Sequence, residues 1–170
     1  MRKVIFHPPK AYGLATNSDQ IDDPLEKGYF VEAAAIADAF IDNNLLYMSA
    51  LYGERKTQHP SGKPVSGKEH LNFLHQKGDI PDTLNESIIV FKNDRNVMAH
   101  EIHGEYNLLF DRENSWWDKY KTQKEIDERV RTLAREVVEN GKNAFFQLEN
   151  IFMNHPKNPA RDQLKRSGFL

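Results

Sequence analysis

The stretch PDTLNESIIVFKNDRNVMAHEIHG, residues 81–104, has the spacing, the start signal and the stop signal of an amphipathic helix. Proline suits the first position of a helix, because the N–H group that it lacks would have no partner there, and glycine suits the position just past the end. The apolar residues recur at spacings that place them on one side of a helix, and they are Leu84, Ile88, Phe91 and Met98. We therefore expect a helix from about Pro81 to His103 that ends at Gly104.

Three more helices are expected, two before this stretch and one after it. Each begins with an acidic or hydroxyl residue followed three positions later by glutamate, which is the pattern of a capping box. The pairs are Asp23 with Glu26, Ser66 with Glu69, and Thr122 with Glu125. The apolar spacing then predicts helices over about 23–55, 66–77 and 122–153.

Four helices with mostly short connections bury their apolar stripes most simply as an antiparallel four-helix bundle, so the expected fold class is all-α. We expect an N-terminal arm over 1–22, the helical bundle over 23–155 and a basic C-terminal tail over 156–170. An irregular aromatic segment that contains Trp116 and Trp117 precedes the last helix. Its tryptophans are expected to cover one end of the core in preference to stacking on nucleic acid bases.

The composition narrows the classes of function. The chain of 170 residues has no cysteine, which excludes a disulfide framework and a thiolate metal site and favours the cytoplasm. No apolar run approaches the roughly 20 residues that cross a bilayer, so we expect no membrane contact. The formal net charge of -2 excludes attraction of the whole protein to nucleic acid, and any RNA contact must come from a local patch.

The end of the quoted stretch, DRNVMAHEIH at 94–103, is unusually polar for a helix that packs on a core. At about 100° per residue, Asn96, His100 and His103 share one stripe, whereas Arg95 lies about 140° from His100. One helix does not easily direct Arg95 and His100 at the same atom. Either the long arginine stem curls around the helix, or a second copy of the helix supplies the partner across a two-fold axis.

Two other interpretations of this cluster remain open. In the structural one, Arg95 is a favourable charge near the helix end that pairs with Asp94 or Glu101, and His100 is an interface histidine. In the other, a metal is bound by His100, His103 and Glu105, although histidines three apart do not match the helical zinc-protease spacing. Two more histidines, His70 and His75, are expected at the surface of the short helix.

The order of these elements resembles the HEPN superfamily of small helical proteins. A long helix, a short helix, GDIPDTL, a helix with DRNVMAH near its end and a long final helix follow one another from about Asp23 to Met153. The motif of the family is arginine, a polar residue that is often asparagine, three further residues and histidine. RNVMAH at 95–100 matches this motif at every defined position.

The resemblance implies a homodimer whose two motifs face each other, and in many members a metal-independent ribonuclease without a cofactor. Members include toxins of toxin–antitoxin pairs and abortive-infection proteins, so a cognate antitoxin is an expected partner beside RNA. The chemistry suits the residues: His100 is the expected base, Arg95 holds phosphate oxygens, and Asn96 fixes the imidazole or binds phosphate. We expect His103 and Lys92 to bind substrate, with His103 as a second proton carrier.

Two further hypotheses stand beside the ribonuclease. A HEPN bundle without catalytic activity would bind RNA, a nucleotide or a protein partner through the same face. A purely structural helical dimer would use the motif for packing alone.

Overall fold

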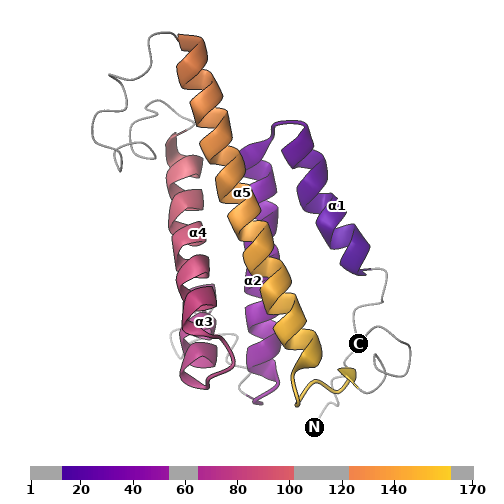
Figure 1. Cartoon of the computed structure of the whole chain (residues 1–170). Coiled ribbons are helices and arrows are strands. Elements are labelled where there is room, and N and C mark those ends of the chain that lie inside the picture. The colour runs from indigo at the N-terminus through magenta and orange to yellow at the C-terminus, as the bar shows by residue number, and fades with distance from the viewer. Residues whose placement is uncertain (1–12, 54–64, 102–122, 162–170) are drawn as a thin grey trace.

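The computed structural model describes residues 13–53, 65–101 and 123–161 of the chain, and these residues form five helices and no strand (Figure 1). The helices are α1 (Gly13–Glu26), α2 (Phe30–Ala50), α3 (Gly67–Gln76), α4 (Asp82–Glu101) and α5 (Gln123–Asn154). They pack against one another, which confirms the all-α class. No helix in these three ranges is long and apolar enough to cross a membrane.

The N-terminal part of the described chain corrects two predictions. Residues from Gly13 onward, expected in an arm, form α1, and Pro24, expected at a helix start, lies in the last turn of α1. The chain then turns at Gly28, where φ is +80°, and α2 begins only at Phe30. The described residues therefore hold five helices where four were predicted.

The burial of α1 explains why the capping signal at Asp23 was misleading. Ile21 is fully buried and Leu25 almost fully buried. Burying such side chains contributes about 1.5–3 kcal/mol each. Together they offset a cost of about 3 kcal/mol for proline inside a helix.

The other helix starts and stops follow their local signals. Ser66 Oγ accepts a hydrogen bond from the Glu69 backbone N–H, and the Glu69 carboxylate accepts one from the Ser66 backbone N–H, so the predicted capping box is confirmed. Gly78, with φ of +80°, follows the end of α3 as expected. The predicted end of α4 at His103, the aromatic segment with its tryptophans and most of the basic tail lie outside the described residues.

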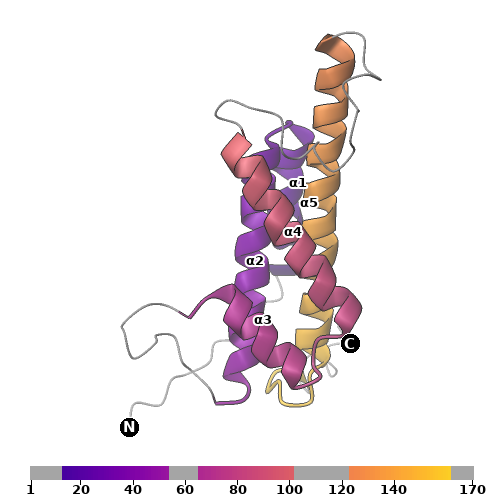
Figure 2. The same ribbon diagram turned by 90° about the vertical axis from the view of Figure 1, so that its left-hand side faces the viewer.

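The core lies between α2, α4 and α5, with α1 and α3 covering its sides (Figures 1 and 2). The four predicted apolar residues of α4, Leu84, Ile88, Phe91 and Met98, are all buried. Helices α4 and α5 approach closely at Gly141, where an added Cβ would lie 2.3 Å from the Phe91 ring. This packing fixes the inner face of α4 and leaves its polar C-terminal half beside α2.

Candidate functional site

A group of charged and polar side chains links α2 and α4 near the predicted motif. Asp38 and Asp42 lie one turn apart on α2, and Lys92, Arg95 and Asn96 lie within about one turn on α4. We call these five residues the α2–α4 charge cluster. It contains three of the five residues that the sequence predicted for the site.

Arg95 is held by a partner on each terminal nitrogen. Its Nη2 forms an ion pair with Asp38 Oδ2, and its Nη1 donates a hydrogen bond to Asn96 Oδ1 at 2.8 Å. The Nε atom is buried and has no hydrogen-bond partner in the described structure. The side chain is 30% exposed, so the guanidinium is oriented from the inside while part of it remains open to solvent.

Lys92 bridges the two aspartates. Its Nζ forms an ion pair with Asp38 Oδ1 and lies 2.8 Å from Asp42 Oδ1. Both oxygens of Asp38 are therefore occupied, one by each cation. Two carboxylates and two cations leave the cluster formally neutral, which lowers its attraction for an anion such as a phosphate.

Asp38 is the residue that sequence reasoning missed. It is buried on α2, next to the buried Ala37 and one turn before the buried Ile41. A carboxylate is almost never buried without a cation or hydrogen-bond donors, because its desolvation is too costly. An aspartate inside an apolar stripe was therefore a readable signal that a cation approaches α2 from another helix.

Gly67 gives Asp42 its place at the start of α3. A Cβ added at Gly67 would lie 1.9 Å from Asp42 Oδ1, so only glycine allows this close approach. The N-terminal end of a helix carries a partial positive charge that favours a nearby carboxylate. Asp42 is thereby held between α3 and Lys92.

The predicted site residues are only partly brought together. Arg95 and Asn96 are in direct contact, and Lys92 lies one turn earlier, engaged by the two aspartates. The backbone of His100 lies in the last turn of α4, but its side chain is outside the described structure, as are His103 and Glu105. The convergence of Arg95 and His100 stays a prediction.

The structure adds an ion pair from another helix to the structural interpretation. That interpretation expected Arg95 to pair within its own helix, with Asp94 or Glu101. Among the described side chains, Arg95 is paired with Asp38 of α2, while a pairing with Asp94 or Glu101 stays a prediction. An ion pair between two helices can both support packing and orient the guanidinium. The structural and the catalytic interpretations of Arg95 are therefore compatible.

The histidines of α3 correct one further prediction. His70, expected at the surface, is buried, and its Nδ1 lies 3.1 Å from Ser49 Oγ. Burial lowers the pKa of His70, because the charged imidazole loses its hydration. His75 is partly exposed and lies 2.7 Å from Asp82 Oδ1. The His70 imidazole packs against α2, and the His75 imidazole contacts the first residue of α4.

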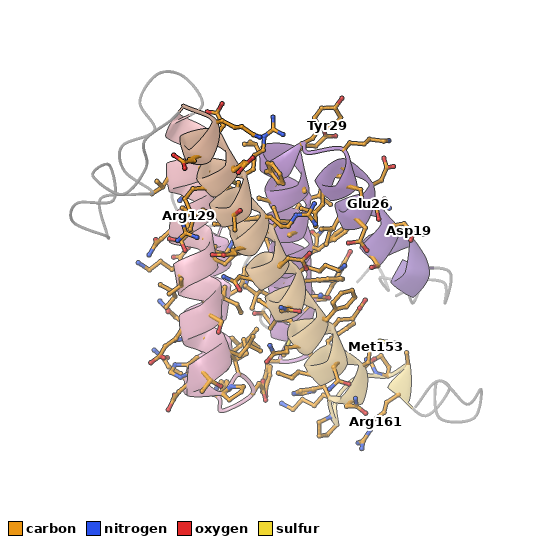
Figure 3. The ribbon with its side chains drawn as sticks, turned by 45° about the horizontal axis from the view of Figure 1, so that its top comes forward. Asp19, Glu26, Tyr29, Arg129, Met153 and Arg161 are labelled. Atoms are coloured by element: carbon orange, nitrogen blue, oxygen red, sulfur yellow. The ribbon has the colours of Figure 1, made fainter. Side chains whose placement is uncertain are left out.

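A second surface feature lies between α1 and α2. An open pocket there has Asp19, Asp23 and Glu32 among its lining residues, with the exposed Tyr29 beside them. Figure 3 shows the side chains of Asp19 and Tyr29 on this part of the molecule. Its three carboxylates outnumber its one cation, Lys27, so its net charge disfavours an RNA phosphate, and the α2–α4 charge cluster is the candidate site.

In the part of the chain that the structure describes, no three histidine or carboxylate side chains are grouped so that they could hold a metal ion. No protein-family model, curated protein or solved structure was found to match the chain. The HEPN resemblance therefore rests on the sequence motif and its place on α4.

Proposed function

We propose that the protein is a metal-independent RNA endonuclease of the HEPN type that acts as a homodimer. The observation that carries the proposal is the fixed orientation of Arg95 by Asp38 and Asn96, five residues before His100 on the same helix. A guanidinium has five N–H groups in a rigid plane, and these two bonds use two of them. A planar cation held in one orientation suits the paired oxygens of a phosphate.

The proposed reaction uses the hydroxyl of the RNA itself. His100 takes the proton of the 2′-hydroxyl, the 2′ oxygen attacks the phosphorus, and the bond from phosphorus to the 5′ oxygen breaks. The leaving oxygen receives a proton, for which His103 is the proposed donor. Arg95 stabilises the negative charge that grows on the phosphate oxygens. The products are a 2′,3′-cyclic phosphate and a 5′-hydroxyl.

The outer face of α4 supports the proposed dimer. Ile89 is 39% exposed and Val90 is 45% exposed, so two adjacent aliphatic side chains lie open on α4. By helix register, positions 89, 93, 96 and 100 fall on one stripe, so the exposed Ile89 shares a face with Asn96 and His100 of the motif. A second copy seated there would bury both aliphatic residues and bring two motifs together.

The oligomeric state tests this part of the proposal directly. Sedimentation at micromolar concentration should give a species of twice 19.7 kDa. A monomer at that concentration would remove the composite site and leave the structural interpretation ahead.

The activity itself is tested with purified protein and RNA in the presence of a chelator. We expect cleavage that leaves a 2′,3′-cyclic phosphate or its opened form, while DNA of the same sequence survives because it lacks the attacking hydroxyl. Cleavage that needs a divalent metal, or that cuts DNA equally well, would contradict the mechanism.

One observation favours a second candidate function, a HEPN bundle that binds RNA, a nucleotide or a protein without catalysis. Both cations of the α2–α4 charge cluster are already paired with carboxylates, which weakens their ability to stabilise the charge that a phosphate gains during cleavage. This second function would be supported if the wild type cleaves no RNA while Arg95→Ala weakens RNA binding in a salt-dependent way.

The cytoplasm as location and a cognate antitoxin as partner belong to the same proposal. A neighbouring gene for a small nucleotidyltransferase-like antitoxin would support the toxin role. A neighbourhood without any candidate antitoxin would favour RNA processing or defence without a paired inhibitor.

A further inference from the structure

We infer that Asp38 is a positioning residue, which holds the Arg95 guanidinium in the orientation in which it binds the RNA phosphate. The inference rests on the proposed ribonuclease function and adds to it a residue from a different helix. Asp38 does not touch the substrate in this arrangement, because it lies buried behind Arg95. It acts on the reaction through Arg95 alone.

The surroundings of Asp38 make it a rigid support. One of its oxygens is paired with Arg95 and the other with Lys92, and Lys92 is itself held in place by Asp42. Asp42 in turn lies against the start of α3 at Gly67. Rotation of the Asp38 carboxylate would break two ion pairs at once, so the position of Arg95 is set by three helices.

The energetics indicate a role beyond stability. Buried ion pairs contribute little to folding, because the desolvation of both charges offsets their attraction, and apolar residues in their place are often as stable. Within the described residues, Arg95 Nε is also buried without a hydrogen-bond partner, a further cost. A network that is costly and that ends at the motif residue Arg95 fits a functional support better than a packing contact.

Asp38 has two opposite effects on RNA, and they can be separated. Its negative charge lowers the affinity of the cluster for phosphate, whereas its hold on Arg95 favours the transition state, in which the phosphate carries more charge. Removing the carboxylate should therefore leave RNA binding unchanged or tighter and yet slow the chemical step. A residue that serves only the fold would not produce this split between KM and kcat.

The experiment compares Asp38→Asn with Asp42→Asn in the full-length protein. Each variant removes one carboxylate charge with little change in shape and takes one partner from Lys92. Of the two, Asp38→Asn alone removes the carboxylate that is paired with Arg95 Nη2. We expect kcat to fall at least ~10-fold in Asp38→Asn, because small displacements of a catalytic group have large effects, and to fall clearly less in Asp42→Asn, which reaches Arg95 only through Lys92 and Asp38. The KM for RNA should not rise in either variant.

Two additions keep the test decisive. In an Arg95→Lys background, Asp38→Asn should cause little further loss, because Asp38 acts through the guanidinium. If Asp38→Asn does not fold, Asp38→Glu replaces it, because glutamate keeps the negative charge. The longer side chain displaces the carboxylate by one methylene, so Asp38→Glu should lower kcat without tightening RNA binding. Equal kcat in Asp38→Asn and Asp42→Asn, or an undiminished loss in the Arg95→Lys background, would overturn the inference.

A readout that needs no cleavage separates this inference from the proposed function. Nitrogen NMR should show slow rotation of the Arg95 guanidinium in the wild type and in Asp42→Asn, and fast rotation in Asp38→Asn. If the wild type cleaves no RNA, the proposed function fails, and the NMR comparison alone decides whether Asp38 positions Arg95. Unchanged rotation in Asp38→Asn would overturn the inference whatever the activity.

Discussion

Tyr52 donates its hydroxyl hydrogen to Asp79, with 2.7 Å between Tyr52 Oη and Asp79 Oδ2, and joins the turn after α2 to the turn before α4. The other oxygen of Asp79 lies 3.2 Å from His155 Nε2. Because His155 Nδ1 accepts the backbone N–H of Lys157, its proton lies on Nε2, which donates to Asp79. Three segments distant in sequence are thus tied together at the end of the bundle opposite the motif.

This network predicts an unusual tyrosine titration. The hydrogen bond to Asp79, followed by burial, raises the pKa of Tyr52 to about 12 from the ordinary value of 10.0. The folded pKa exceeds the unfolded one, so the stabilisation from this bond is complete below pH 10 and is lost as the pH rises through 12. Asp79→Asn should move the Tyr52 ionisation toward pH 10 in an ultraviolet absorbance titration.

Tyr52→Phe serves as the control, because it identifies the Tyr52 signal among the six tyrosines of the chain. A wild-type titration in which the Tyr52 signal changes near pH 10 would show that the bond to Asp79 does not persist in solution.

His70 predicts a loss of stability in mild acid. Burial lowers its pKa in the folded protein below the ordinary 6.5, so the unfolded chain takes up the proton first as the pH falls. The contribution of the neutral imidazole is therefore complete above pH 6.5 and is lost as the pH falls toward the lowered value. The urea midpoint measured between pH 7.5 and pH 5 should fall less in His70→Gln than in the wild type.

His75→Gln is the matched control, since His75 lies on the same helix but is partly exposed beside Asp82. It should keep the acid sensitivity that depends on His70. Equal pH dependence in all three proteins would show that His70 is not a determinant of acid stability.

The contact between Gly141 and Phe91 predicts the effect of a single methyl group. A Cβ at position 141 would lie 2.3 Å from one carbon of the Phe91 ring and 2.6 Å from another, and this ring is buried on all sides. Overpacking costs about 1–3 kcal/mol, whereas alanine gains about 1 kcal/mol over glycine within a helix. Gly141→Ala should therefore lower the free energy of unfolding.

A double variant separates the two effects. Phe91→Leu makes room for the methyl group, so adding Gly141→Ala to Phe91→Leu should cost less than adding it to the wild type, or even stabilise. Denaturant unfolding of the four proteins measures this coupling. Strict additivity would mean that α4 and α5 are not in close contact at this point.

Local sequence signals predicted the helices correctly where neighbouring residues determine the structure. They failed where contacts with distant residues determine it. The Ser66 capping box and the apolar stripe of α4 depend on neighbours within a few residues, and both are found as predicted. Asp23 and Pro24 give the same local signal, but the burial of Ile21 and Leu25 draws them into the end of α1. The spacing of the apolar residues did not reveal that burial.

The same distinction applies to the candidate site. The motif residues Arg95 and Asn96 were predicted from one helix, and in the structure their side chains form a hydrogen bond with each other. Asp38 and Asp42 lie some fifty residues earlier in the chain, and their approach to Lys92 depends on how α2 and α4 pack. The one sequence feature that could have predicted this approach is the aspartate within the apolar stripe of α2.

The last prediction separates the roles of Arg95 and His100. Loss of a positioned general base lowers a rate by ~10²–10⁴-fold, so His100→Ala should lose cleavage while it still binds RNA and unfolds near the wild-type temperature. Arg95→Ala should lose both cleavage and RNA affinity, because a cation that holds phosphate acts before and during the reaction.

The contacts of Arg95 complicate its alanine variant, since Asp38 would keep only Lys92 as a partner and some stability would be lost. Arg95→Lys keeps a cation beside Asp38 and is the better test: it should fold normally and still cleave slowly, because an ammonium cannot offer two parallel N–H groups to a phosphate. Cleavage, RNA binding and thermal unfolding are measured for all three variants. If each lowers the unfolding temperature and none alters RNA cleavage or binding, the RNVMAH motif serves packing and not chemistry.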